Sequence, residues 1–178
     1  MRSLALPLIA LPVVFATACA MAPKVDNASL PEAVRVPAGH AQAWHTTTAG
    51  GEITYECRAK KDMADQFEWA FVAPVATLKA GDKVVGKYYG GPTWEATDGS
   101  KVTGKQVAVA PGMPGSIPLQ LVKANPAEGA GALVGVSYIQ RLSTQGGVAP
   151  ALPCGMAQKG QRQVVSYQAD YVFYKPAM

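Results

Sequence analysis

The chain has 178 residues, enough for one domain with a sizeable core and too few for two comfortable ones. Only 16% of the residues are charged, whereas 18 glycines and 14 prolines favour short strands and turns over long charged helices. The net charge of +4 is small, and no aromatic residue interleaves the basic cluster of Arg58, Lys60 and Lys61. The sequence therefore gives no indication of nucleic-acid binding.

The first eighteen residues have the pattern of a secretory signal peptide. Arg2 is the basic start, residues 4–15 form a short apolar segment, and Ala16 and Ala18 are the small residues of a cleavage site. The apolar segment is too short to span a bilayer as a helix, which needs ~20 residues. We expect residues 1–18 to be removed and the mature chain to work outside the cytoplasm; a buried N-terminal helix is the alternative.

Cys19 follows the expected cleavage site. Residues 16–19, Ala-Thr-Ala-Cys, resemble the bacterial lipobox, in which the cysteine thiol is lipidated, although Ala16 stands where leucine is usual. An exported protein with three cysteines has an odd one, and lipidation of Cys19 leaves Cys57 and Cys154 as a pair. We expect a lipoprotein with a Cys57–Cys154 disulfide bond. Cleavage by ordinary signal peptidase and two separate buried thiols are the alternatives.

The segment after the cysteine predicts a location and a tether. Ala20 stands where aspartate would favour retention in the inner membrane, so by resemblance to the enterobacterial sorting pattern we expect the periplasmic side of the outer membrane. A soluble periplasmic or secreted protein is the alternative. Residues 19–37 contain three prolines and no sustained period, which predicts an extended or disordered, lipid-anchored tether. The membrane is therefore an expected partner.

Residues 38–178 show period-two alternation of apolar and polar side chains, the pattern of half-buried strands. The predicted strands cover residues 52–58, 66–72, 116–121, 131–140 and 163–174. Residues 92–110 predict a hairpin, because Asp98-Gly99 is a strong signal for a tight turn, and Tyr88 and Tyr89 end the strand before it. No capped helical period extends over twelve residues. The sequence predicts one all-β domain, a β-sandwich or a barrel of mainly antiparallel strands.

Several ordered motifs resemble those of the DUF3455 family of bacteria and fungi over residues 36–175. They are VPAGH (36–40), YEC (55–57), W-x-F-x-A-P from Trp69 to Pro74, GPTWEATDGSKV (91–102), YIQRLSTQGGVAP (138–150), Cys154 and Y-x-ADYVFY (167–174). The resemblance implies one compact secreted or envelope domain. Because the family has no established activity, it supplies no catalytic residues.

The titratable residues predict no metal site or cofactor. The two histidines, His40 and His45, stand five apart around Trp44, outside any spacing typical of metal ligands. Catalysis by paired carboxylates is the enzymatic hypothesis, and it needs two carboxyl groups ~5–9.5 Å apart. The candidates are Glu56, Glu68, Glu95, Asp98 and Asp170. Glu95 is the strongest candidate, because it directly follows Trp94 and a segment rich in glycine and proline precedes both.

A binding site is the favoured hypothesis. Aromatic faces stack on sugars or other rings, and nearby polar side chains supply hydrogen bonds. The candidate side chains are Tyr88, Tyr89, Trp94, Glu95, Gln140 and Arg141. The alternative is that Trp94 packs in the core while Arg141 pairs with an acid such as Glu95.

We therefore predict a non-catalytic envelope lipoprotein that binds a glycan or another envelope component. A secreted hydrolase of an envelope or extracellular polymer, using paired carboxylates, is the alternative function. A structural or stress-related envelope protein without a small ligand is a third.

Overall fold

The computed structural model describes residues 23–177, and the expected signal peptide and Cys19 lie outside them. The described residues form eight strands and three 3-10 helices. The strands are β1 (His40–Lys60), β2 (Met63–Ala80), β3 (Lys83–Tyr89), β4 (Thr93–Ala96), β5 (Lys101–Ala110), β6 (Leu119–Ala124), β7 (Tyr138–Gly146) and β8 (Arg162–Pro176); the 3-10 helices are η1 (Asn27–Ser29), η2 (Glu32–Val34) and η3 (Met156–Gln158). Among the described residues, no helix is long and apolar enough to cross a membrane.

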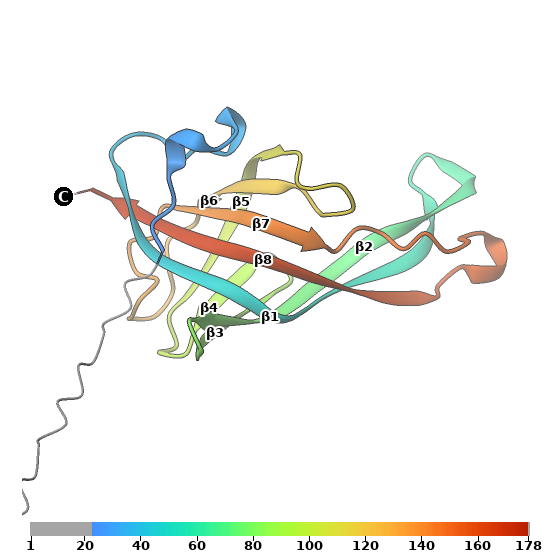
Figure 1. Ribbon diagram of the computed structural model, residues 1–178. Coiled ribbons are helices and arrows are strands. Elements are labelled where there is room, and N and C mark those ends of the chain that lie inside the picture. Colours follow the sequence, from blue (N-terminus) through green and yellow to red (C-terminus); the bar gives the residue numbers. More distant parts are fainter. Residues whose placement is uncertain (1–22, 178) are drawn as a thin grey trace, which may run out of the picture.

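The strands form a closed antiparallel barrel in chain order, in which each strand pairs with the next and β8 pairs with β1 (Figure 1). The prediction of an all-β domain is confirmed, and of its two forms the structure shows the barrel. The hairpin turn is also confirmed, because Gly99 has φ 87° between β4 and β5. Closure pairs the first strand with the last, so within the barrel no strand has an unpaired edge of the kind that an open sheet presents.

Strands β1, β2 and β8 are longer than the others and project beyond the barrel. β3 pairs with β2 only as far as Val75, whereas β1 and β2 stay paired to Lys60 and Met63. We call this projection, residues 52–74 of β1 and β2 with residues 162–166 of β8, the arm (Figure 1). The loop of residues 147–161 lies along it.

Aromatic side chains fill the barrel interior. The ring centroids of Tyr88 and Trp94 lie 5.1 Å apart, those of Tyr88 and Tyr171 lie 4.8 Å apart, and Phe173 packs beyond them. Tilted and edge-on contacts of this kind add to the burial energy of large rings. Side chains therefore fill the interior, as expected for a barrel of eight strands.

A second apolar cluster lies on the outside of the barrel. Val34 and Val36 are buried against Leu142, Val172 and other outward side chains of β5 to β8. Consequently β8 is covered on both faces near its end, which explains the unbroken apolar run of residues 171–174. The expectation of an extended or disordered tether over residues 19–37 is therefore wrong for residues 25–36, which form a packed segment with two 3-10 turns.

The predicted strand over residues 131–140 is wrong in its first half. β7 begins only at Tyr138, and residues 131–137 form turns in which Gly131 and Gly135 have φ of 147° and 79°. Leu133 and Val136 reach the interior core while Val134 is exposed, so the alternation predicted neither the strand nor the buried side chains of residues 131–137. Pro118 stands directly before β6, as expected for a strand start.

Candidate functional site

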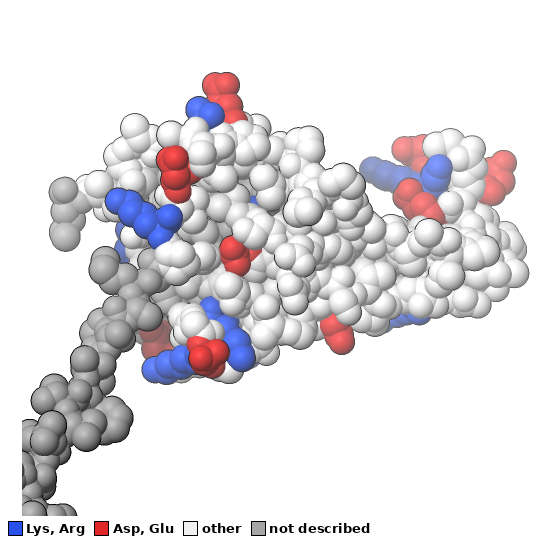
Figure 2. All heavy atoms as spheres, viewed as in Figure 1, with Lys and Arg blue, Asp and Glu red and all other residues white. Residues whose placement is uncertain are grey.

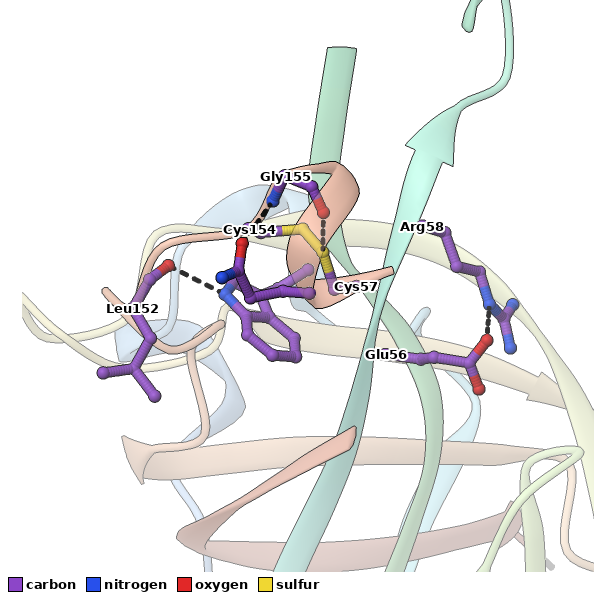
Figure 3. The surroundings of a disulfide bond; sticks show 8 residues. Glu56, Cys57, Arg58, Leu152, Cys154 and Gly155 are labelled. Carbon is purple, nitrogen blue, oxygen red and sulfur yellow. Dashed lines mark hydrogen bonds and ion pairs between the residues drawn. A yellow bond between two sulfur atoms is a disulfide. The ribbon is translucent and has the colours of Figure 1, made fainter. Parts of the chain in front are cut away.

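Cys57 of β1 and Cys154 of the loop 147–161 form a disulfide bond, with 2.04 Å between the sulfur atoms and 5.6 Å between the Cα atoms (Figure 3). The predicted pairing is confirmed. Three further bonds hold the loop on the arm: the Gly160 amide donates to the Cys57 carbonyl, the Cys57 amide donates to Gln161, and Trp69 Nε1 donates to the Leu152 carbonyl.

Glu56 lies beside the disulfide and holds two arginines. Its carboxylate accepts hydrogen bonds from Arg58 Nε at 2.7 Å and from Arg162 Nε at 2.8 Å, and Figure 3 shows the first of these contacts. The two guanidinium groups lower the pKa of Glu56 to about 2. This candidate acid is therefore a fixed anion that joins β1 to β8.

Two of the three aromatic residues proposed for ligand stacking lie in the core. Trp94 is 1% exposed and Tyr88 is 6% exposed, and the two pair directly across β3 and β4. Glu95 follows Trp94 on the same strand and so points to the opposite face of the sheet. A single surface that includes Trp94, Tyr88 and Glu95 is consequently excluded by strand geometry.

Gln140 is also buried, beneath the N-terminal segment. Its Nε2 donates to the Val34 carbonyl at 2.6 Å and to Asn27 Oδ1 at 3.0 Å, and its Oε1 accepts from the Tyr174 hydroxyl at 2.8 Å. The side chain thus has partners for its amide donors and its oxygen. Gln140 holds the outer cluster together and is not accessible to a ligand.

Arg141 faces the barrel interior, opposite Tyr171 in the register of β7 and β8. It donates from Nη2 at 2.9 Å and from Nε at 3.2 Å to the Pro118 carbonyl, so the pair with Glu95 that the alternative hypothesis named does not form. Burial raises the pKa of Tyr167 and Tyr171, and the Arg141 charge opposes the rise. Both hydroxyls are buried without a hydrogen-bond partner among residues 23–177.

Glu95 lies on the outer face of the barrel in a polar cluster. Its Oε2 accepts from the Tyr89 hydroxyl at 2.8 Å, and its Oε1 lies 3.1 Å from Lys87 Nζ. The Lys87 ammonium also lies 5.5 Å from the centroid of the Tyr89 ring. The hydrogen bonds from Tyr89 and Lys87 lower the pKa of Glu95, which is therefore a carboxylate at neutral pH.

The cluster borders two adjoining pockets that share Thr77 and Lys87. The larger has a volume of about 430 Å³ and the smaller about 260 Å³. We call them together the outer groove. Its lining side chains include Val75, Thr77, Val84, Lys87, Tyr89, Glu95 and Thr97.

The outer groove combines an aromatic ring, two threonine hydroxyls, a carboxylate and an ammonium group. These groups can donate and accept several hydrogen bonds while Val75 and Val84 supply apolar contact, which suits a polyhydroxylated ligand. Sequence reasoning selected Glu95 and Tyr89, but it grouped them with Tyr88 and Trp94, which are buried, and it did not name Lys87. The signal that was missed is alternation: Lys87 and Tyr89 flank the buried Tyr88 and so share the face of Glu95.

Of the other candidate acids, Asp98 and Asp170 are engaged in structural contacts. Asp98 accepts from the Ser100 amide and hydroxyl and from the Ala132 amide, which fixes the turn to the loop 126–137. Asp170 Oδ2 lies 3.5 Å from His45 Nε2. Glu68 is exposed on the arm. The described residues contain no group of three or more His, Cys, Asp or Glu side chains that could hold a metal ion.

Comparison with known proteins yields one family. The model of the family described as "Protein of unknown function (DUF3455)" matches residues 37–81 and 79–175, which is most of the chain. No curated protein and no solved structure matches it significantly.

Proposed function

The chain belongs to the DUF3455 family, and from this premise we propose that it is a lipid-anchored envelope protein that binds a glycan or another envelope component without catalysis. The observation that carries the proposal is the Cys57–Cys154 disulfide. Such bonds persist in oxidising compartments, which supports export. The bond also uses two of the three cysteines, so that Cys19 is left for the lipid.

The anchor is tested by the intact mass of the protein purified from its own host, before and after reduction. We expect the mass of a chain that starts at Cys19 and carries acyl groups, with a gain of two hydrogens on reduction. The mass of an unmodified chain would contradict the anchor. It would leave a soluble exported protein with Cys19 as a free or intermolecular thiol.

The outer groove is the proposed binding site, because it is the concave surface at which Glu95 and an aromatic ring are both accessible. Tyr89 presents a ring to solvent, and Lys87 and Glu95 lie at its edge. Since Glu95 is held as an anion by two donors, it is suited to accepting hydrogen bonds and unsuited to acting as a general acid.

We expect Tyr89→Ala to weaken binding of soluble peptidoglycan fragments or envelope polysaccharide about two- to tenfold, as the loss of ~0.5–1.5 kcal/mol of aromatic contact implies. Titration calorimetry of the disulfide-bonded protein measures the effect. Tyr138→Ala is the matched control, because Tyr138 is a partly exposed tyrosine elsewhere on the barrel. Equal affinities of the two variants would exclude the groove, and release of sugar fragments by the wild type would favour the hydrolase instead.

A further inference from the structure

The described chain is fastened to the barrel from its first residues. The Pro23 carbonyl accepts from Gln42 Nε2 at 2.8 Å and lies 3.2 Å from His45 Nδ1. The Val25 amide donates to Gln42 Oε1 at 2.8 Å. Two residues of β1 therefore hold the N-terminal segment before it reaches the buried Val34 and Val36.

This attachment leaves little chain between the barrel and the proposed anchor. Cys19 precedes Pro23 by four residues. Because an extended chain spans at most ~3.6 Å per residue, a lipidated Cys19 lies within roughly 14 Å of Pro23. The tether expected to hold the domain away from the membrane is thus far shorter than residues 19–37 suggested, and the surface around Pro23 must lie close to the bilayer.

That surface is the end of the barrel at which β1 begins and β8 finishes (Figure 1). We call it the near end. It carries Lys24, Lys123, Val134, Tyr138 and Lys175, of which Val134 is 47% exposed.

The near end has the chemistry of a surface that meets phospholipid headgroups. The Lys123 ammonium lies 4.2 Å from the centroid of the Tyr138 ring, and the Lys175 side chain passes close to Gly135. Figure 2 shows basic side chains beside the start of the described chain. Acids lie at this end as well: exposed Asp26 follows Lys24 by two residues and caps η1, exposed Asp82 stands in the turn between β2 and β3, and Glu128 is paired with Lys101. Lysines and an aromatic ring with a polar tip are typical of membrane interfaces.

We propose that the near end lies against the phospholipid headgroups and that the arm projects away from the membrane. The proposal rests on the lipid anchor proposed above and adds an orientation to it. Twenty residues of β1 separate His40 from Lys60, so at ~3.3 Å per residue the tip of the arm lies up to roughly 65 Å from the near end. The disulfide-bonded loop is then presented to the aqueous side.

The orientation is tested with the acylated, disulfide-bonded protein in phospholipid vesicles. Val134→Cys and Lys61→Cys are labelled separately with a fluorophore; in the acylated protein the introduced cysteine is the one free thiol. Lipids with a nitroxide on the headgroup serve as the quencher. We expect strong quenching at position 134 and little at position 61. Equal quenching, or stronger quenching at position 61, overturns the orientation.

A second variant tests the attachment itself. The double variant Gln42→Ala/His45→Ala removes the side-chain contacts to Pro23 and Val25, which lengthens the free chain and should reduce the difference in quenching between the two labelled positions. Gln66→Ala on the arm is the matched control and should preserve it. An acylated protein that shows no difference contradicts the orientation alone, whereas a protein without acyl groups contradicts the anchor, and the orientation falls with it.

Discussion

Neighbouring groups determine the state of the polar side chains in this barrel. Glu56 and Glu95 are both carboxylates held by two donors, and each is an anion in a contact between strands. Gln140 is an amide whose hydrogen bonds are made inside the protein. Residue type alone would allow each of these side chains to bind a ligand. Their roles are decided by the face of the strand on which each side chain lies and by the groups that contact it there.

The contribution of Glu56 should depend on pH. Its folded-state pKa of about 2 lies below the ordinary 4.5, so its stabilising contribution is present above pH 4.5 and is lost as the pH falls towards 2. Glu56→Gln should therefore be less stable than the wild type at pH 7. The difference in the free energy of unfolding between the two proteins should decrease as the pH falls from 4.5 towards 2. Urea unfolding across the pH range measures it, with exposed Glu68→Gln as control. A gap that stays constant down to pH 2 would contradict the ion-pair role.

Gln140→Ala should lower the free energy of unfolding. It leaves the Val34 carbonyl and the Tyr174 hydroxyl without partners in a buried site, and each such group costs about 1–3 kcal/mol. Gln120→Ala is the control, because the Gln120 side chain contacts Gln106 near the surface. Urea unfolding distinguishes the two. Equal stability of the variants would show that Gln140 does not hold the outer cluster.

At the scale of the element, the N-terminal segment packs on the outside of the barrel as an additional layer. It covers outward side chains of β5 to β8 that an isolated barrel would leave exposed. The effect is clearest for strand β8, because its Val172 and Tyr174 face outward and are nevertheless buried. The segment is therefore structural as well as a connection towards the proposed anchor.

Val34→Ala should destabilise the protein by about 1–3 kcal/mol, because it removes two methyl groups from a fully buried site. The change should also expose the N-terminal segment to proteases. Val107→Ala is the control: Val107 is 57% exposed, and surface substitutions of this kind stay within about 0.5 kcal/mol. Thermal unfolding measures the loss of stability, and limited proteolysis measures the exposure of the N-terminal segment. A Val34→Ala protein as stable as the control would mean that the segment does not contribute to stability.

At the scale of the molecule, two long-range connections define the shape. Pairing of β1 with β8 closes the barrel, and the Cys57–Cys154 bond joins residues 97 apart and fixes the loop 147–161 on the arm. The disulfide therefore stabilises the arm more directly than the barrel. The outer groove lies on the barrel wall formed by β2, β3 and β4.

Replacing both bridge cysteines by serine should lower the free energy of unfolding by about 2–5 kcal/mol. Because the loop is then held only by hydrogen bonds, trypsin should cleave first after Lys159, an exposed residue of that loop. Mass spectrometry of the early fragments locates the cut. The wild type under non-reducing conditions is the control, and resistance of Lys159 in the double variant would show that the disulfide does not hold the loop.

The sequence by itself determined the all-β class, the turn at Asp98-Gly99, the family and the pairing of Cys57 with Cys154. These features follow from local alternation, turn chemistry, cysteine count and ordered sequence motifs, which need no knowledge of distant contacts. Only the tertiary structure decided that the sheet closes as a barrel, that residues 25–36 pack on its outer face, and that Trp94 and Gln140 are buried. Alternation shows that neighbours point to opposite faces, but burial depends on what covers each face: closure of the barrel buries Trp94, and the N-terminal segment covers Gln140.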